Sequence, residues 1–466
     1  MIDIRQLERL DFSGRPVTVV GLGIEGIDFA RYLARRGALV TVADSRTEAQ
    51  LADRLNEVRD LPLTLDLGAN DPIAGVDAVF VSQSVPLDSA QLSGLAERGI
   101  PIYSMVPLFL ELAPGPVVGI TGSSGKSTTT ALVAEMFRAD ERPTFVGGNI
   151  GVGLLEHLDS IRTYTWSVLE ISHTQLQLGD RSPHVAAVLN ITPNHLDAFS
   201  WDDYRRLKSN LLRHQTPSDI AVLNYDDPEV RALEPLVQGG LIWFTMETDL
   251  PASGVFVRDG WAIYRDNDGE RPLFAIDSLR LRGWHNQQNA VSAAAIAMAA
   301  GVTPEAIACA VEAFRGIPHR LEHVGDFDGV SYYNDSIATT PDRTIAGLRS
   351  FSEPVVLLLG GRDKKLPLED LAKEALARCR GIVLFGEAAE MLESALRSAE
   401  NARGIPIIRL EDLPLAVAAA RGIAQEGDVV LLAPACTSYD AYQNFEERGE
   451  HFRRLANGEE VQSSRR

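Results

Sequence analysis

Apolar runs of strand length recur along the chain, and most are followed by a turn and a segment with helical spacing. The first run covers residues 17–20, after which the pattern predicts a helix over 27–36 and strands over 39–43 and 78–82. Strands that alternate with helices in this way favour an α/β domain built on a parallel sheet.

A second group of elements occupies the middle of the chain. It opens with an apolar run at 118–121, and further strands are predicted near 164–169 and 185–190. The alanine-rich run 289–300 carries small apolar residues, which predicts a buried helix with Gly301 at its C-terminus.

Gly316-Ile-Pro318 interrupts this pattern and begins a third group. Its predicted strands alternate with helices and cover 330–334, 355–359, 381–385 and 428–432. The pattern therefore predicts another doubly wound domain.

The composition fits a globular protein with more than one domain. The chain has 466 residues, of which 45% are hydrophobic and 23% are charged, and this length exceeds one ordinary core. No segment approaches the roughly 18 consecutive apolar residues of a membrane span, and the N-terminal residues lack the apolar run of a signal peptide. The three cysteines are far apart, which suits a reducing compartment. We therefore expect a cytoplasmic protein without a membrane span.

The formal net charge of −20 argues against non-specific nucleic-acid binding, because polyanions would be repelled and no basic block offsets the charge. Small anionic substrates remain compatible with it, since local cations and helix N-termini can outweigh the global field. The acidic charge and the absence of heptads favour a monomer.

The most informative motif is Thr121-Gly-Ser-Ser-Gly-Lys-Ser-Thr128, which follows an apolar run and precedes helix-compatible residues. Such a turn directs backbone N–H groups at a phosphate, while Lys126 adds a positive charge and the Ser127 hydroxyl suits Mg²⁺. The strict pattern has a further glycine where Ile120 stands. A glycine-rich surface turn with an incidental lysine would also fit the letters, but the order of strand, turn, Lys-Ser and helix favours a nucleoside-triphosphate site.

The first apolar run leads into a second glycine motif, Gly21-x-Gly23-x-x-Gly26, which is followed by Asp44. This is the dinucleotide-binding fingerprint, in which the glycines let the backbone approach a pyrophosphate. The motif does not identify the nucleotide. It leaves open an NAD-dependent oxidoreductase, although that function gives the other motifs of the chain no role.

Two further strand ends carry groups that phosphoryl transfer needs. Glu170 ends an apolar strand, where a carboxylate can hold Mg²⁺, and His195 and Asp197 follow the strand that ends at Asn190. Alone, Glu170 could equally be an N-cap and His195 a structural histidine. Their convergence on one phosphate-binding loop favours a shared catalytic site.

These patterns predict an α/β protein with three domains. We expect a Rossmann-like N-terminal domain over 1–107, a central P-loop ATPase-type doubly wound domain over 108–316, and a C-terminal Rossmann-like domain over 317–466.

The order of the motifs resembles the Mur ligase family, ATP-dependent amide-forming enzymes of peptidoglycan precursor synthesis. The resemblance extends from Val17 to Leu455. It rests on loop 121–128, Gly147-Gly-Asn-Ile-Gly151, Glu170, Asn190 with His195-Leu-Asp197, Lys208, His285-Asn286 with Asn289, Pro318-His-Arg320, Asn334-Asp-Ser336, and Ser438 with Asn444-Phe445. The last pair is most similar to the branch that adds glutamate, usually D-glutamate, to UDP-N-acetylmuramoyl-L-alanine through an acyl phosphate.

The resemblance implies a role for each matching residue. Lys126, Glu170, His195 and Lys208 would be catalytic; Ser127 and Glu170 would hold one Mg²⁺, and His195 and Lys208 a second. In this family the lysine that matches Lys208 carries a carbamate formed with CO₂, which turns a cation into an oxygen ligand. Without the resemblance, Lys208 would be interpreted as a solvated helix lysine.

The resemblance also implies three sets of binding residues. ATP would contact Thr121, Gly122, Ser123, Ser124, Gly125, Lys126, Ser127, Thr128, Asn286, Asn289, Arg320 and Asp335. The UDP-linked substrate would contact Gly23, Ile24, Glu25, Gly26, Asp44, Arg46, Ser82, Asn149 and His195. The incoming amino acid would contact Thr339, Lys364, Ser438 and Phe445.

Three segments depart from the pattern usual in enzymes that add D-glutamate. His173-Thr174 stands where those enzymes have Ser-Phe or Ser-Tyr, Ile337 replaces a lysine, and Ser82-Gln-Ser-Val-Pro replaces Ser-Pro-Gly-Val-Pro. The first two leave open a ligase that uses L-glutamate. A non-catalytic nucleotide sensor also stays open, and so does a folylpolyglutamate synthetase-like enzyme, which the extra N-terminal domain disfavours.

Overall fold

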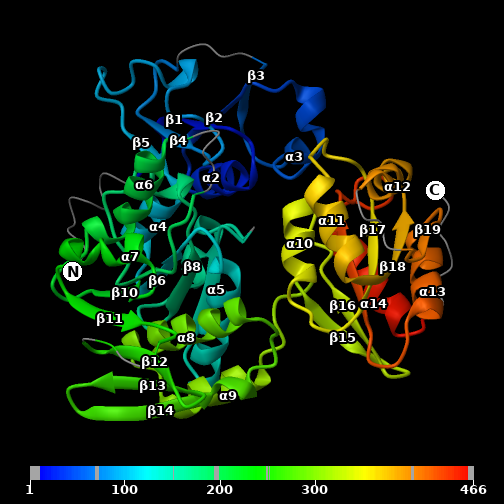
Figure 1. The fold of residues 1–466 in the computed structure, drawn as a ribbon. Helices are drawn as coiled ribbons and strands as arrows, with labels where there is room; N and C mark the ends of the chain where they lie inside the picture. The colour runs from blue at the N-terminus through cyan, green and yellow to red at the C-terminus, as the bar shows by residue number, and fades with distance from the viewer. Residues whose placement is uncertain are drawn as a thin grey trace. The chain divides into compact units, whose positions relative to one another are not determined.

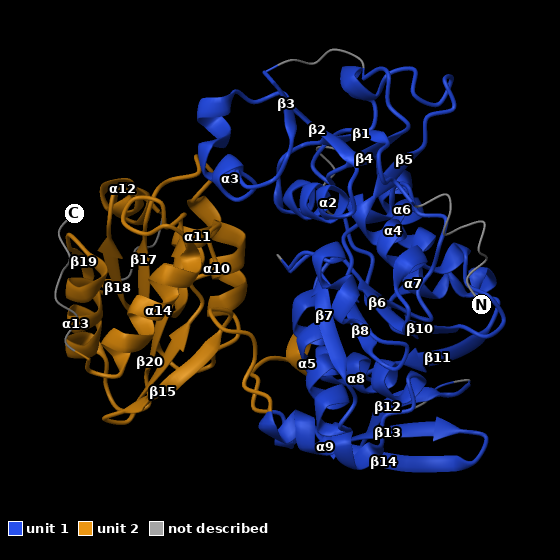
Figure 2. Ribbon diagram, turned by 180° about the vertical axis from the view of Figure 1, so that it is seen from behind, with its two compact units in different colours: residues 1–279, 288–313 blue, residues 280–287, 314–466 orange. Residues whose placement is uncertain are grey.

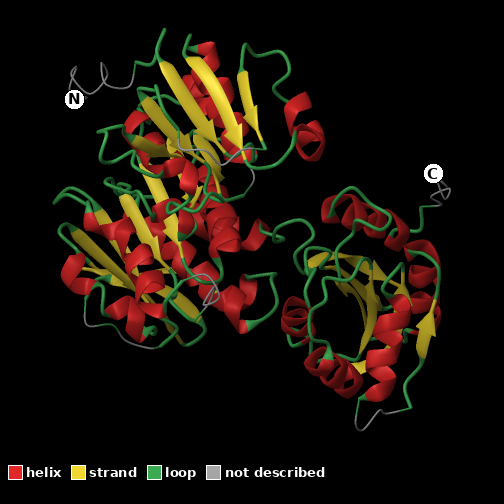
Figure 3. Ribbon diagram, turned by 90° about the horizontal axis from the view of Figure 1, so that it is seen from above, coloured by secondary structure: helices red, strands yellow, loops and turns green. Residues whose placement is uncertain are grey.

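The computed structural model describes residues 11–68, 73–150, 152–193, 199–247, 250, 252–399 and 404–459. Over these residues the chain forms three sheets with helices packed around them (Figures 1 and 3), which confirms the predicted α/β class. Two compact units are present: Met1–Leu279 with Gln288–Ala313, and Arg280–Gln287 with Phe314–Arg466 (Figure 2). The first unit contains two of the sheets, and the domain boundaries near 107 and 316 stay predictions.

The N-terminal sheet is parallel, with strand order β3-β2-β1-β4-β5. Its elements are β1 (Pro16–Val20), α2 (Ile24–Arg35), β2 (Leu39–Asp44), α3 (Ala52–Asn56), β3 (Thr64–Leu67), β4 (Ala78–Val81) and β5 (Ile102–Ser104). Alternation along β1 separates the two faces, because Val17 and Val19 belong to the same core cluster as Phe29 of α2, whereas Val20 packs with residues of β4. The sequence pattern located β1, α2, β2 and β4 but missed the short strands β3 and β5.

The central sheet has the strand order β14-β13-β12-β11-β10-β9-β6-β8-β7. Its strands are β6 (Val117–Thr121), β7 (Thr144–Gly148), β8 (Trp166–Glu170), β9 (Val185–Val188), β10 (Ile220–Asn224), β11 (Gly240–Phe244), β12 (Gly254–Arg258), β13 (Trp261–Asp266) and β14 (Gly269–Ala275). The helices around it are α4 (Met105–Leu112), α5 (Lys126–Ala139), α6 (Trp201–Arg213), α7 (Pro228–Arg231), α8 (Trp284–Ala299) and α9 (Pro304–Ala313).

The antiparallel hairpins of β12, β13 and β14 at one edge of this sheet were not predicted. The buried alanine-rich helix is confirmed, but α8 begins at Trp284, before the alanine-rich run. Within the described part of the chain, no helix is both long enough and apolar enough to cross a bilayer.

The N-terminal and central sheets are joined inside the first unit by buried polar contacts. Both carboxylate oxygens of Asp28 on α2 accept backbone hydrogen bonds at the start of a short 3₁₀ helix, from Leu154, Leu155 and Glu156 at 2.6, 2.9 and 2.8 Å. Arg31 on the same helix forms an ion pair with Glu156. One face of α2 therefore caps an element of the central domain, which fixes the glycine motif at its N-terminus beside that domain.

The C-terminal sheet has the order β15-β16-β20-β17-β18-β19, and only the β15–β16 pair is antiparallel. Its elements are β15 (Glu322–Phe327), β16 (Val330–Asn334), α10 (Pro341–Leu348), β17 (Val355–Gly360), α11 (Glu369–Arg378), β18 (Cys379–Phe385), α12 (Ala389–Ser398), β19 (Ile407–Arg409), α13 (Leu413–Ile423), β20 (Val429–Ala435) and α14 (Phe445–Ala456).

Helices cover both faces of this sheet, as Figure 3 shows. Leu357 and Leu359 of β17 pack with α10, α11 and α12, whereas Val356 and Leu358 pack with α13 and α14. The continuous apolar run in β17 follows from burial on both sides. The four predicted strands are confirmed, and β15 and β19 were missed.

Candidate active site

The phosphate-binding loop connects β6 to α5 as the motif predicts. Gly125 is the N-cap residue of α5 and has φ +81°, a left-handed conformation that favours glycine. Lys126 begins the helix, and its Nζ donates to the carbonyl oxygen of Gly122 at 2.9 Å. The loop thus presents a helix N-terminus together with a lysine ammonium, which is an arrangement suited to a phosphate.

The segment that follows β9 holds this loop in place. The backbone N–H groups of Ser123 and Ser124 donate to the backbone and side-chain oxygens of Asn190, at 3.0 and 2.9 Å. The Ser123 hydroxyl lies 3.0 Å from the Tyr204 hydroxyl and donates to the Thr192 carbonyl at 3.1 Å. Asn190 and Tyr204 therefore shape the loop, a role that their sequence positions did not predict.

Glu170 is the last residue of β8, which runs parallel to β6. Its register pairing with Ile120 places it at the carboxyl ends of these strands, where the phosphate-binding loop also begins. Its side chain is only 3% exposed, and Oε1 accepts a hydrogen bond from Asn149 Nδ2 at 2.9 Å. Among the described residues, the buried Oε2 has no hydrogen-bond partner. A buried carboxylate oxygen that is left without a donor fits the predicted Mg²⁺ site.

Lys208 lies on α6 and is 1% exposed, so it is not the solvated lysine that its local sequence suggests. Its Nζ lies 4.9 Å from the centroid of the Tyr204 ring. Burial, and then the nearby charge of Lys126, lower the pKa of Lys208 from 10.5 to about 7. Within the described residues no salt bridge reaches Lys208 to offset these two effects.

A cavity of about 860 Å³ brings the phosphate-binding loop and Lys208 together. Lys126, Lys208 and Asn149 line it, together with Gly122, Ser123, Ser172, His173, Thr174, Gln177, Phe199 and Tyr204 of the central domain and residues 83–88 of the N-terminal domain. The site therefore faces the N-terminal domain and is large enough for a ligand of substantial size.

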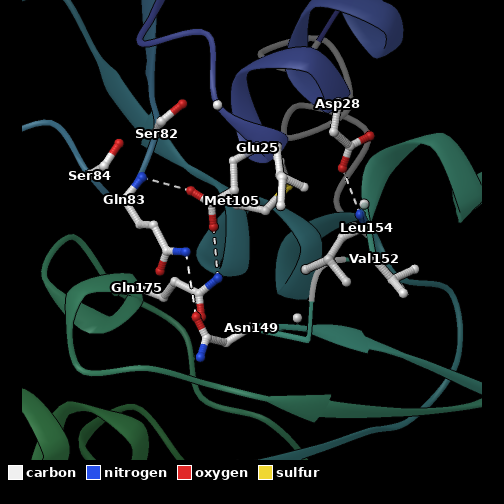
Figure 4. Close-up of a pocket in the computed structure, with 14 residues that line it drawn as sticks. Glu25, Asp28, Ser82, Gln83, Ser84, Met105, Asn149, Val152, Leu154 and Gln175 are labelled. Atoms are coloured by element: carbon white, nitrogen blue, oxygen red, sulfur yellow. Dashed lines mark hydrogen bonds between the residues drawn. The ribbon is translucent and has the colours of Figure 1, made fainter. Parts of the chain in front are cut away.

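A smaller neighbouring cavity of about 220 Å³ contains most of the predicted UDP-substrate residues. Gly23, Ile24, Glu25, Ser82 and Asn149 line it, and Figure 4 shows Glu25, Ser82 and Asn149 around one space.

Two of these side chains are already held by protein groups. Glu25 accepts hydrogen bonds from the Gln83 backbone N–H and from Gln175 Nε2, both at 2.7 Å, and burial raises its pKa. The Ser82 hydroxyl donates to the Gly21 carbonyl at 2.6 Å.

Asp44 and Arg46, two other residues predicted for this substrate, form a bidentate pair at the end of β2. Asp44 also accepts the backbone N–H of Leu22 at 2.8 Å, which fixes the glycine turn from behind. Although burial opposes ionisation, the hydrogen bonds and charge of Arg46 keep the pKa of Asp44 below its usual value. The pair is not part of the 220 Å³ cavity lining.

Two departures from the family pattern contact each other at Gln83, which lines both cavities. The Gln83 side-chain oxygen accepts hydrogen bonds from the Ser172 and Thr174 hydroxyls, at 3.0 and 3.2 Å. Its amide nitrogen lies 3.5 Å from Asn149 Oδ1, as Figure 4 shows. Gln83 and Thr174 therefore bond across the two domains, next to the residue that holds Glu170.

The residues predicted for the incoming amino acid gather in the second unit. Lys364 Nζ donates to the Thr339 hydroxyl at 3.0 Å, and burial lowers the pKa of Lys364. Ser438 is buried in the loop after β20, and Phe445 begins α14, where its ring lies edge-on to His319. An ammonium beside a hydroxyl suits a carboxylate ligand.

The remaining ATP-side residues are divided between the units. Asn289 of the first unit lies beside the phosphate-binding loop, because a Cβ added to Gly125 would lie 2.3 Å from its Oδ1. In the second unit, Asn286 donates to the Arg282 carbonyl at 2.7 Å.

Asp335, in the same unit, accepts the Leu321 N–H at 3.1 Å, next to Arg320 in the chain. Burial raises the pKa of Asp335 to about 6.

His195 lies outside the described residues, so its predicted role stays a prediction. In the described part of the chain, no group of three or more His, Cys, Asp and Glu side chains is placed to hold a metal ion. The carboxylate of Glu170 is the described group that fits a cation.

The chain matches models of Mur ligase domains in three places. These are "Mur ligase MurD-like, N-terminal domain" over residues 15–104, "Mur ligase middle domain" over 120–297 and "Mur ligase, glutamate ligase domain" over 319–436. A Symbiobacterium thermophilum protein named "UDP-N-acetylmuramoylalanine--D-glutamate ligase" is 41% identical over 94% of this chain and 96% of its own length. The chain belongs to the Mur ligase family.

Other relatives of this Mur ligase agree with that assignment. A Koribacter versatilis protein of the same name is 39% identical over 96% of this chain and 98% of its own. The solved UDP-N-acetylmuramate-alanine ligase of Thermotoga maritima matches with a TM-score of 0.59 and 19% identity, over 96% of this chain and 100% of that one. At that identity the structural match supports the fold alone.

Proposed function

We propose that this Mur ligase joins D-glutamate to the terminal carboxylate of UDP-N-acetylmuramoyl-L-alanine, with conversion of ATP to ADP and phosphate, in peptidoglycan precursor synthesis. The single observation that carries the proposal is the near full-length similarity to proteins named for this reaction. The site agrees with it chemically, because residues of the phosphate-binding loop and Asn149, which holds the buried Glu170 carboxylate, line a cavity shared with the N-terminal domain. A cytoplasmic, monomeric enzyme remains our expectation.

The phosphate-binding loop and Lys126 would bind the ATP phosphates and hold the γ-phosphoryl group next to the substrate carboxylate. Ser127 and Glu170 would hold one Mg²⁺, and His195 with a modified Lys208 a second. These cations, when bound, would reduce the repulsion between two anions that must meet. Asn149 fixes one oxygen of Glu170 and leaves the other for the cation. Catalysis would thus come mainly from positioning and electrostatics.

The reaction would proceed in two steps. An oxygen of the alanyl carboxylate attacks the γ-phosphorus, the bond to the β-phosphate oxygen breaks, and ADP leaves. The free amine of glutamate then attacks the carbonyl carbon of the acyl phosphate, phosphate leaves, and the amine nitrogen loses a proton. Lys364 and Thr339 would bind a glutamate carboxylate, with Ser438 and Phe445 completing the pocket.

A carbamate on Lys208 is part of the proposal. Only a neutral amine attacks CO₂, and burial lowers the pKa of Lys208 to about 7, so the reactive form is abundant under ordinary conditions. Carbamate formation releases a proton and converts the group to an anion. That anion would interact favourably with Lys126, whereas the protonated amine is repelled by it.

The proposal is tested by ATP-dependent phosphate release with UDP-N-acetylmuramoyl-L-alanine, with D-glutamate and L-glutamate offered in parallel and the product analysed by mass. We expect release and a product with D-glutamate only, and neither in a control without an amino acid. Reaction with L-glutamate alone would contradict the proposed stereochemistry and direct attention to His173, Thr174 and Ile337. Absence of product with both would contradict the acceptor substrate.

A further inference from the structure

Arg448 on α14 is a fully buried guanidinium without an ion pair to any described carboxylate. Its nitrogens donate instead to backbone carbonyls and one hydroxyl. Nε donates to Ser336 Oγ at 3.0 Å; Nη1 to the carbonyls of Gly360, Cys436 and Thr437 at 3.4, 3.2 and 3.1 Å; and Nη2 to those of Ser336 and Cys436 at 2.9 and 3.3 Å. Burial lowers the pKa of Arg448 to about 10, so it stays charged at neutral pH.

The acceptors belong to the ends of three parallel strands. Ser336 follows β16, Gly360 ends β17, and Cys436 with Thr437 follows β20. Each segment continues within a few residues to one group of the predicted amino-acid pocket, namely Thr339, Lys364 and Ser438.

The fourth pocket residue is connected to the same centre. Phe445 precedes Arg448 by one turn of α14, and its carbonyl accepts the Ser336 hydroxyl at 2.8 Å. One guanidinium therefore joins all four pocket-bearing segments.

Close backbone packing accompanies these hydrogen bonds around Arg448. Gly361 has φ +122°, and a Cβ at that position would lie 1.9 Å from the Thr437 carbonyl oxygen and 2.9 Å from Arg448 Nη1. Arg362 and Thr437 then pair through reciprocal backbone hydrogen bonds at 2.9 and 3.0 Å. The loop that leads to Lys364 therefore packs against the loop after β20 and against the Arg448 guanidinium.

We propose that Arg448 is the positioning residue of the amino-acid pocket, where its guanidinium sets the relative placement of Thr339, Lys364, Ser438 and Phe445. Because Arg448 is fully buried, it acts through these residues and does not touch the substrate. The inference rests on the proposed function, since it assigns the pocket to glutamate. A planar fork with five donors matches several carbonyls at once, whereas a lysine ammonium cannot reach all of them.

Steady-state kinetics of Arg448→Lys test the proposal, with glutamate, ATP and the UDP-linked substrate varied in turn. We expect the KM for D-glutamate to rise at least about tenfold, equivalent to about 1.4 kcal/mol, while the KM for the UDP-linked substrate stays within about twofold. The KM for ATP should stay within the same range. Arg421→Lys is the matched control. Arg421 lies on α13 and donates to the carbonyls of Leu455 and Ala456, at the opposite end of α14 from Phe445. Its KM values should match the wild type.

A proportional rise of all three KM values, or an unchanged KM for glutamate, would overturn the proposal. If Arg448→Lys does not fold, Ser336→Ala decides, because it removes one bond to Arg448 and one to Phe445 but leaves the guanidinium caged by carbonyls. It should raise the KM for glutamate in the same selective way, and an unchanged value would overturn the proposal. Failure of the proposed function is separate, since the wild-type enzyme would then form no product with D-glutamate.

Discussion

The two units each bury a cation, and the two environments are opposite. Lys208 in the first unit has the Tyr204 ring beside it and the charge of Lys126 nearby, and no described carboxylate forms an ion pair with it. Arg448 in the second unit donates to four backbone carbonyls and a hydroxyl. Burial lowers the pKa of both, to about 7 for Lys208 and about 10 for Arg448.

The difference is that burial favours the neutral form of Lys208, whereas hydrogen bonds keep Arg448 charged and in place. A buried charge that hydrogen bonds satisfy stabilises the surrounding backbone, whereas one that lacks partners is driven towards its neutral form. A neutral amine in an accessible cavity is nucleophilic, so its environment favours chemistry at that position. Burial alone would not distinguish the two residues; their hydrogen-bond partners do.

The largest expected effect is the loss of turnover in Lys208→Met. The side chain would keep its length but could no longer form the carbamate, and we expect kcat to fall about 10³-fold, equivalent to about 4 kcal/mol. Phosphate release with saturating substrates measures kcat, and binding of a fluorescent ATP analogue should be retained. Lys373→Met, on the exposed side of α11, is the control and should be fully active. Activity of Lys208→Met within tenfold of the wild type would eliminate the catalytic role of Lys208.

The second effect concerns stability, and the two cations should give opposite signs. Lys208→Met removes a desolvated amine and should raise Tm. The pKa of Lys208 is about 7 in the folded chain and 10.5 for the free side chain. Burying the charged amine therefore lowers the free energy of unfolding of the wild type by the full amount below pH 7, and this cost declines as pH rises towards 10.5. The advantage of Lys208→Met in Tm should therefore be large at pH 6.5 and small at pH 9.5.

Arg448→Met should lower Tm at both pH values, since its carbonyl acceptors lose donors at about 1–3 kcal/mol for each buried group left unsatisfied. Differential scanning calorimetry in bicarbonate-free buffer makes the comparison. A pH-independent gap for Lys208→Met would mean that its pKa is not lowered by folding. A gain in stability for Arg448→Met would show that the arrangement of the four carbonyls around Arg448 does not depend on the guanidinium.

The sequence predicted many of the regular elements but missed short and edge strands, and it also missed the buried interior strand β10 of the central sheet. The strands β17 and β20 have long apolar runs because both faces are buried, β1 is apolar except for the buried Thr18, and all three were located within a few residues. The strand β19 has only three residues, none of them fully buried, and β14 is mostly exposed at the sheet edge. Such strands carry no hydrophobic period, so tertiary pairing alone defines them.

The candidate site divides in the same way. The glycine and lysine positions of the phosphate-binding loop follow from local geometry and could be predicted, as could Glu170 at its strand end. The bonds from Ser172 and Thr174 to Gln83 connect residues far apart in the chain and could not be predicted. Arg448 lies close to Asn444-Phe445 in the chain, but only the structure reveals that its donors reach three strand ends.

The smallest effect should come from the junction of Gln83 and Thr174, the hydrogen-bonded pair that belongs to two of the departures from the family pattern. Gln83→Ala and Thr174→Val each remove the 3.2 Å bond between these side chains, so their effects on kcat/KM for the UDP-linked substrate should not add. A double-mutant cycle should give a coupling of about 0.5–1 kcal/mol. Gln83→Ala with Thr47→Val is the control cycle and should be additive, because Thr47 bonds to Gln50 elsewhere in the N-terminal domain. Additivity in the first cycle would mean that the junction does not position the substrate, which would leave the two departures without a joint role in this ligase.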